Sequence, residues 1–88
     1  MTRQRVVISG LVQGVFFRDT VRRRAQAAGV GGWVRNNWDG SVEAAFEGDA
    51  ESVARLVQFC REGPRGARVD RVEIVDEEPE GLRGFEIR

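Results

Sequence analysis

The sequence predicts an α+β fold, namely a ferredoxin-like sandwich in which two helices cover one face of an antiparallel sheet. Two observations support this prediction. Hydrophobic periodicity follows the order βαββαβ, with a short C-terminal strand after it. An Asp-Gly turn signal joins the two middle strands into a hairpin. The whole chain, residues 1–88, is expected to form a single domain, because its length suits one core and no linker or repeat divides it.

The first predicted strand leads through a glycine-containing loop into a helix. β-branched side chains at positions 6–8 indicate a strand over residues 5–9. From position 17, apolar side chains recur at helical spacing, which predicts a helix over residues 17–28. Gly29 follows as a helix stop.

A β-hairpin is expected after this helix. Residues 30–36 and 41–47 both have the composition of strands, and apolar residues alternate along the second of them. Asp39 and Gly40 lie between the two segments and form a turn signal. The two strands are therefore predicted to pair.

The second half of the chain contains one helix and two strands. Asp49 is well placed to cap a helix over residues 50–62, which has an apolar stripe of the spacing i, i+3, i+4, i+7. Strands are expected over residues 69–75 and 84–87. The acidic segment between them, residues 76–81, is interpreted as a hydrated turn.

The composition argues against several classes of function. Fourteen basic and fourteen acidic residues give a net charge of zero, which argues against nucleic acid as a partner. There is no Lys, His or Tyr, so any chemistry must use Arg, carboxylates, amides, hydroxyls or water. The single cysteine, Cys60, lies on the apolar stripe of the second helix and is expected in the core, which argues against a disulfide or a zinc site. No segment is apolar for long enough to span a membrane, and we expect a cytoplasmic monomer.

Arg18 is the most informative single residue. A cation in the first turn of a helix opposes the positive end of the macrodipole and costs roughly a few tenths of a kcal/mol. An anion held by the preceding loop would remove this conflict, since Gly14 lets the backbone turn its N–H groups toward a ligand. On the loop alone, an ordinary turn with Arg18 solvated and partnered by Asp19 is the favoured interpretation. The spacing matches neither the Walker P-loop nor the dinucleotide fingerprint.

Two longer motifs resemble the signatures of the acylphosphatase family. They are GLVQGVFFRD at residues 10–19 and GWVRNNWDGSVE at residues 32–43, and they lie at the family's usual separation. The similarity extends to the Gly-Phe-Glu-Ile run at residues 84–87. This resemblance implies the ferredoxin-like fold and a hydrolase that cleaves the carboxyl-phosphate bond of small-molecule acyl phosphates. It also implies that water attacks phosphorus and that no metal or cofactor takes part.

The resemblance further implies roles for individual residues. Arg18 matches the family's phosphate-binding arginine, and Asn36 matches the asparagine that orients the attacking water. The family often has a small hydroxyl residue after that asparagine, where this chain has Asn37. Inorganic phosphate or a similar anion is expected to bind as product or inhibitor. The implied phosphate-binding residues are Gly14, Val15, Phe16, Phe17 and Arg18.

Other interpretations stay open at this point. A ferredoxin-like module without catalytic activity could bind anions or RNA or regulate a partner, although RNA binding favours aromatic side chains exposed on strands. Phe46 and Phe85 are instead expected in the core. A related domain could act on carbamoyl phosphate for a larger pathway. Trp33 and Trp38 could line the acyl side of a pocket, but packing is the more frequent role of Trp in a hairpin.

Overall fold

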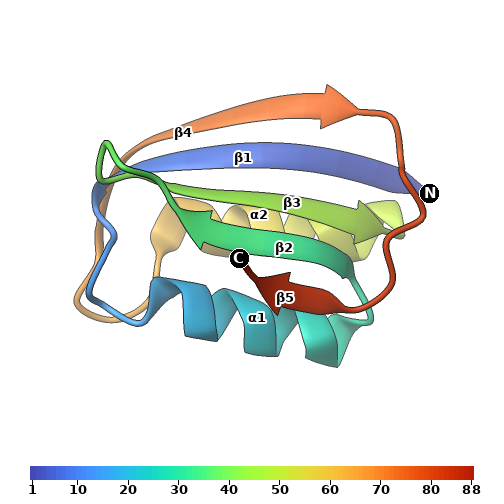
Figure 1. Cartoon of the computed structure of the whole chain (residues 1–88), viewed down its shortest axis with the longest axis horizontal. Coiled ribbons are helices and arrows are strands. Elements are labelled where there is room, and N and C mark those ends of the chain that lie inside the picture. The colour runs from blue at the N-terminus through green and yellow to red at the C-terminus, as the bar shows by residue number, and fades with distance from the viewer.

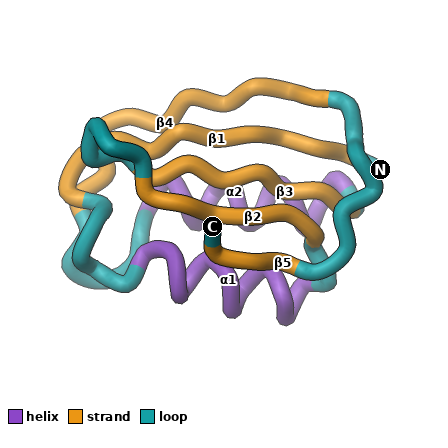
Figure 2. The backbone as a smooth tube through the Cα atoms, in the orientation of Figure 1, coloured by secondary structure: helices purple, strands orange, loops and turns teal.

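A computed structural model describes residues 1–88 as two helices packed on one five-stranded sheet. Figure 1 shows both helices side by side on the same face of the sheet, as predicted. Figure 2 shows that the loop between the first strand and the first helix lies at the same end of the molecule as the turn of the central hairpin. The elements in chain order are β1 (Thr2–Leu11), α1 (Phe17–Ala28), β2 (Gly31–Asn36), β3 (Val42–Gly48), α2 (Ala50–Glu62), β4 (Arg68–Glu77) and β5 (Phe85–Ile87).

Both helices begin and end where the sequence predicts, because their boundaries are set by local signals. In α2, the Asp49 carboxylate caps the helix by accepting a hydrogen bond of 2.9 Å from the Ser52 N–H. In α1, Gly29 has φ 69° and its N–H bonds back to the carbonyls of Ala25 and Gln26. The predicted N-cap of α2 is thereby confirmed.

The two longest strands extend beyond the predicted segments. β1 and β4 pair from Arg3 opposite Glu77 to Leu11 opposite Arg68, with one irregularity in the register after Ser9. The acidic segment after residue 75 was expected to be a hydrated turn, but Glu77 belongs to β4. Its carboxylate accepts hydrogen bonds from the guanidinium groups of Arg3 and Arg5. Cross-strand pairing of charged side chains extends these strands beyond their apolar residues.

The strand order is β4-β1-β3-β2-β5, and the expectation of a purely antiparallel sheet is wrong at one edge. The pairs β1–β3, β1–β4 and β2–β3 are antiparallel, but β5 runs parallel to β2. Figure 1 shows that the segment after β4 crosses the end of the sheet, so β5 and β2 start from the same side. The Glu47 carboxylate holds this crossing segment by accepting hydrogen bonds from the N–H groups of residues 80–82. The parallel direction therefore depends on the path of the chain across the sheet.

The core lies between the sheet and the two helices. Phe17 and Val21 of α1 pack there, as do Phe46 and Phe85, whose rings stack at a centroid distance of 5.7 Å. Cys60 is fully buried in this core, as predicted, and burial raises the pKa of its thiol to about 12. Neither helix has the length and apolarity needed to cross a membrane.

Candidate active site

The loop that enters α1 has an unusual backbone conformation. Phe16, the N-cap residue, lies in the left-handed region with φ 61° and ψ 26°, and it is the only residue other than glycine with positive φ. This conformation costs a bulky side chain roughly 1–2 kcal/mol. Gly14, two residues earlier, has φ 75°. Such strain concentrates at functional sites, where the surrounding structure holds it in place.

The loop and the first turn of α1 present a set of unpaired backbone donors. The first hydrogen bond of the helix runs from the Thr20 N–H to the Phe16 carbonyl. From Gly14 to Asp19, no backbone N–H donates to an acceptor of the protein, and Phe16 has no side-chain group that could cap the helix. Consecutive free N–H groups at the positive end of a helix dipole attract an anion.

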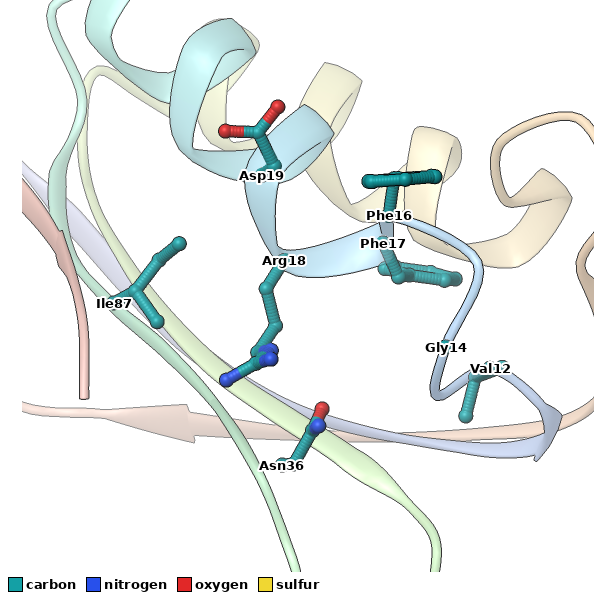
Figure 3. A pocket seen from close by; sticks show the side chains of 8 residues that line it. All are labelled: Val12, Gly14, Phe16, Phe17, Arg18, Asp19, Asn36 and Ile87. Carbon is teal, nitrogen blue, oxygen red and sulfur yellow. The ribbon is translucent and has the colours of Figure 1, made fainter.

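The Arg18 side chain extends from this first turn toward Asn36 (Figure 3). Its guanidinium makes no ion pair within the chain, whereas Asp19 pairs at 2.8 Å with Arg22 and at 3.1 Å with Arg23. The pairing of Arg18 with Asp19 that an ordinary turn would favour is therefore absent. Asp19 also points away from both Arg18 and Asn36 in Figure 3.

Asn36 reaches the site because of strand alternation. It is the last residue of β2, two positions after Val34, which is fully buried in the core between sheet and helices. Side chains two positions apart in a strand share a face, so Asn36 also faces the helices. At the strand end, that face meets the start of α1. The Asn36 carboxamide makes no hydrogen bond to any side chain or backbone group of the protein, so both of its polar atoms are free for a ligand (Figure 3).

A cavity of about 380 Å³ lies between these groups. Of the six predicted site residues, Val15 alone does not line it, because its side chain packs against the core. The resemblance assigns Val15 a backbone role, so this placement leaves its role as a prediction. The lining residues are Val12, Gly14, Phe16, Phe17, Arg18, Asp19, Asn36 and Ile87.

Sequence reasoning did not single out three of these lining residues. Val12 is buried, and it lies in the first motif together with Asp19, so inspection of that motif could have included both. Ile87 is different, since it enters the site through the parallel pairing of β5 with β2, where it lies opposite Val34. No local pattern in the sequence predicts that pairing.

The two tryptophans and Asn37 do not line the cavity. Trp38 is fully exposed at the hairpin turn. The guanidinium groups of Arg35 and Arg88 lie 5.0 and 5.3 Å from the centre of the Trp33 ring. Asn37 donates hydrogen bonds to the Ser41 hydroxyl at 3.0 Å and to the Glu43 carboxylate at 3.2 Å. Asn37 therefore stabilises the hairpin turn beside Asn36.

The fold and the cavity define a class of protein: a small α+β sandwich with a polar cavity at the start of its first helix. A guanidinium, free backbone amides and a carboxamide converge there, which suits a tetrahedral oxyanion such as phosphate. Within this class the chain belongs to the acylphosphatase family, whose model matches residues 4–87.

Individual relatives agree with this assignment. The chain is 61% identical over 88 residues to an acylphosphatase of Rubrobacter xylanophilus, covering 98% of this chain and 79% of that one. It is 55% identical over 87 residues to an acylphosphatase of Haloarcula marismortui, covering 99% and 96% of the two chains. The crystal structure of the Bacillus subtilis acylphosphatase superposes with a TM-score of 0.95 at 31% identity, covering 100% of this chain and 99% of that one. These similarities support an enzyme of this family over a non-catalytic module.

Proposed function

We propose that this chain hydrolyses the carboxyl-phosphate bond of small-molecule acyl phosphates and releases a carboxylate and inorganic phosphate. The observation that carries the proposal is the convergence of Arg18, the free loop amides and Asn36 on one cavity of about 380 Å³. The membership of the chain in the acylphosphatase family supports the same activity.

Arg18 and the amides of residues 14–18 would hold the phosphoryl group. Phosphoryl transfer passes through a loose transition state with charge on three equatorial oxygens, so catalysis consists largely of positioning and charge stabilisation. A planar guanidinium and fixed N–H groups supply both without reorganisation. The proposal therefore needs no metal ion, because Arg18 supplies the positive charge that a metal would otherwise contribute.

Asn36 would direct the attacking water. Its carboxamide oxygen can accept a hydrogen bond from a water placed in line with the leaving oxygen, and a phosphoryl oxygen can take the proton. The leaving group is a carboxylate, a weak base that needs no general acid. The absence of His from the sequence is therefore compatible with this chemistry.

The non-catalytic alternatives have less support. Phe46 and Phe85 are buried in the core, so neither ring is free to stack on an RNA base.

We also propose that residues 1–88 act as one domain and as a cytoplasmic monomer that binds no nucleic acid. The net charge of zero argues against nucleic acid as a partner, and one core shared by the sheet and both helices supports a single domain.

The test is phosphate release from benzoyl phosphate in the presence of EDTA. Wild type should turn over without added metal. Arg18→Ala should weaken inhibition by inorganic phosphate and lower the rate roughly 10²–10³-fold, as loss of a transition-state donor does elsewhere. Asn36→Ala should lower kcat while phosphate still binds. Arg55→Ala, which removes an exposed arginine of α2 that pairs with Glu51 and does not line the cavity, should behave as wild type. An inactive wild type, or activity abolished by EDTA, would refute the proposed mechanism.

A further inference from the structure

Gln13 connects the two halves of the candidate site. Its carboxamide Nε2 donates hydrogen bonds of 2.8 Å to the Asn37 carbonyl oxygen and 3.0 Å to the Ser41 carbonyl oxygen. Gln13 directly precedes Gly14, where the proposed phosphate loop begins, and Asn37 directly follows Asn36. One half-buried side chain therefore spans from the loop to the turn that follows β2.

The turn that accepts these bonds is itself well ordered by hydrogen bonds. The Asn37 N–H donates to the Ser41 carbonyl at 2.9 Å, which closes the turn. The Asp39 carboxylate accepts from the Ser41 N–H at 2.9 Å and from its hydroxyl at 2.6 Å. A turn with so many internal bonds moves as a unit, so a shift of its carbonyl groups also shifts Asn36.

No other polar contact joins residues 12–18 to residues 36–41. The ladder between β1 and β3 ends at Ile8 opposite Val42, so it includes neither segment. Neither Arg18 nor Asn36 bonds across the gap. The two hydrogen bonds from Gln13 are thus the only polar link that sets the distance between the loop and the end of β2.

We infer that Gln13 is a positioning residue that aligns Asn36 with a phosphoryl group held by the loop. The inference rests on the proposed function, because it assigns Gln13 a role in orienting the attacking water. In-line attack depends steeply on geometry, and a displacement of about 1 Å can lower the rate roughly a hundredfold. Gln13 acts through Asn36, without contact to the reacting atoms.

The experiment uses Gln13→Met, which keeps the length of the side chain and removes both donors. We expect kcat with benzoyl phosphate to fall roughly ten- to a hundredfold. The inhibition constant of inorganic phosphate should change less than about threefold, because Arg18 and the loop amides are retained. Gln58→Met is the matched control, since Gln58 is exposed on α2 and bonds only to Glu62 there.

Two further measurements separate positioning from a merely structural role. In the Asn36→Ala background, Gln13→Met should lower kcat no further, because the residue that it positions is gone. In NMR spectra of the phosphate-bound protein, Gln13→Met should shift or broaden the Asn36 side-chain amide and leave the amides of residues 14–18 in their bound positions. If Gln13→Met does not fold, Gln13→Asn, which shortens the side chain, takes its place.

An unchanged kcat, an equal loss in both backgrounds, or a loss of phosphate affinity as large as the loss of kcat would overturn the inference. The proposed function fails separately, when wild type itself releases no phosphate from benzoyl phosphate. An active wild type with an unaffected Gln13→Met variant would remove the positioning role alone.

Discussion

At the residue scale, Arg18 lacks the carboxylate partner that Arg22 and Arg23 of the same helix have. Arg22 and Arg23 both pair with Asp19, at 2.8 and 3.1 Å. Asp19 lies in the first turn of α1, where a negative charge suits the helix dipole, and it also lines the cavity. Its two arginine partners reduce the repulsion between this carboxylate and an incoming phosphoryl group. Arg22 and Arg23 therefore screen the Asp19 carboxylate next to the proposed site.

Asp19→Asn should strengthen the binding of inorganic phosphate by about two- to fivefold. The variant removes a partly exposed negative charge beside the cavity, and such charges contribute roughly 0.5–1 kcal/mol. The inhibition constant of phosphate at low ionic strength measures the effect, which should shrink as salt is added. Glu51→Gln removes a carboxylate at the start of α2 and serves as the control. Unchanged or weaker phosphate binding in Asp19→Asn would contradict this account.

At the scale of elements, the two helices begin in opposite ways. In α2, the Asp49 carboxylate accepts a hydrogen bond from the Ser52 N–H in the first turn, so this helix start needs no ligand. The first turn of α1 has no side-chain cap, and its N-cap residue Phe16 adopts a strained conformation. Both helices pack on the same sheet, so the difference is not required by the fold. The uncapped first turn of α1 has the free N–H groups that an anion would bind.

The open face of the sheet, away from the helices, is stabilised by buried and half-buried ion pairs. Glu47 is 2% exposed, and its carboxylate lies 2.7 Å from the guanidinium of Arg3, which is 5% exposed. The same carboxylate accepts the N–H groups of residues 80–82, which lead into β5. Glu47 thereby stabilises the strand that brings Ile87 to the cavity.

Glu47→Ala should lower the free energy of unfolding by about 3–5 kcal/mol, because it leaves a buried guanidinium and several N–H groups unpaired. Urea unfolding measures this loss. Glu51→Ala is the matched control, because the pair of Glu51 with Arg55 is 78% and 72% exposed and contributes about 1 kcal/mol or less. Equal effects of the two substitutions would show that the network on the open face adds no stability of its own.

At the scale of the whole molecule, these carboxylates couple stability to pH. Burial alone raises the pKa of Glu43, but hydrogen bonds from Arg35, Asn37 and Arg5 outweigh it and hold that pKa below the ordinary value of 4.5. Burial likewise raises the pKa of Glu47, and the N–H groups of residues 80–82 together with Arg3 bring it below 4.5. The unfolded chain therefore binds more protons than the folded protein in acid.

The free energy of unfolding should consequently be steady above the unfolded-state pKa of about 4.5 and fall as the pH drops through the lower folded-state values. Urea titrations between about pH 7 and about pH 3 check this dependence. Glu47→Ala should start from a lower stability and show a shallower fall, since one of the titrating groups is missing. Stability that rises on acidification would contradict the assignment of these groups.

The sequence by itself determined both helices and the central hairpin, and it predicted a site made of residues 14–18 and Asn36. The helices follow from apolar spacing and from Asp49 and Gly29 at their ends, and the hairpin follows from Asp39 and Gly40. These signals are local, so each is complete within a few residues of chain. Arg18 stood out by its place in the first helical turn, and the resemblance to the acylphosphatase family added its role and Asn36, because both residues lie within continuous motifs.

Only the tertiary structure decided how these parts meet. The parallel direction of β5, the entry of Ile87 into the cavity and the orientation of Arg18 toward Asn36 all depend on contacts between distant segments. So do the hydrogen bonds from Gln13 to the turn after β2, which span 24 and 28 residues of sequence. Strand order and register are set by packing and by the path of the chain across the sheet, and neither leaves a periodic signal in the sequence.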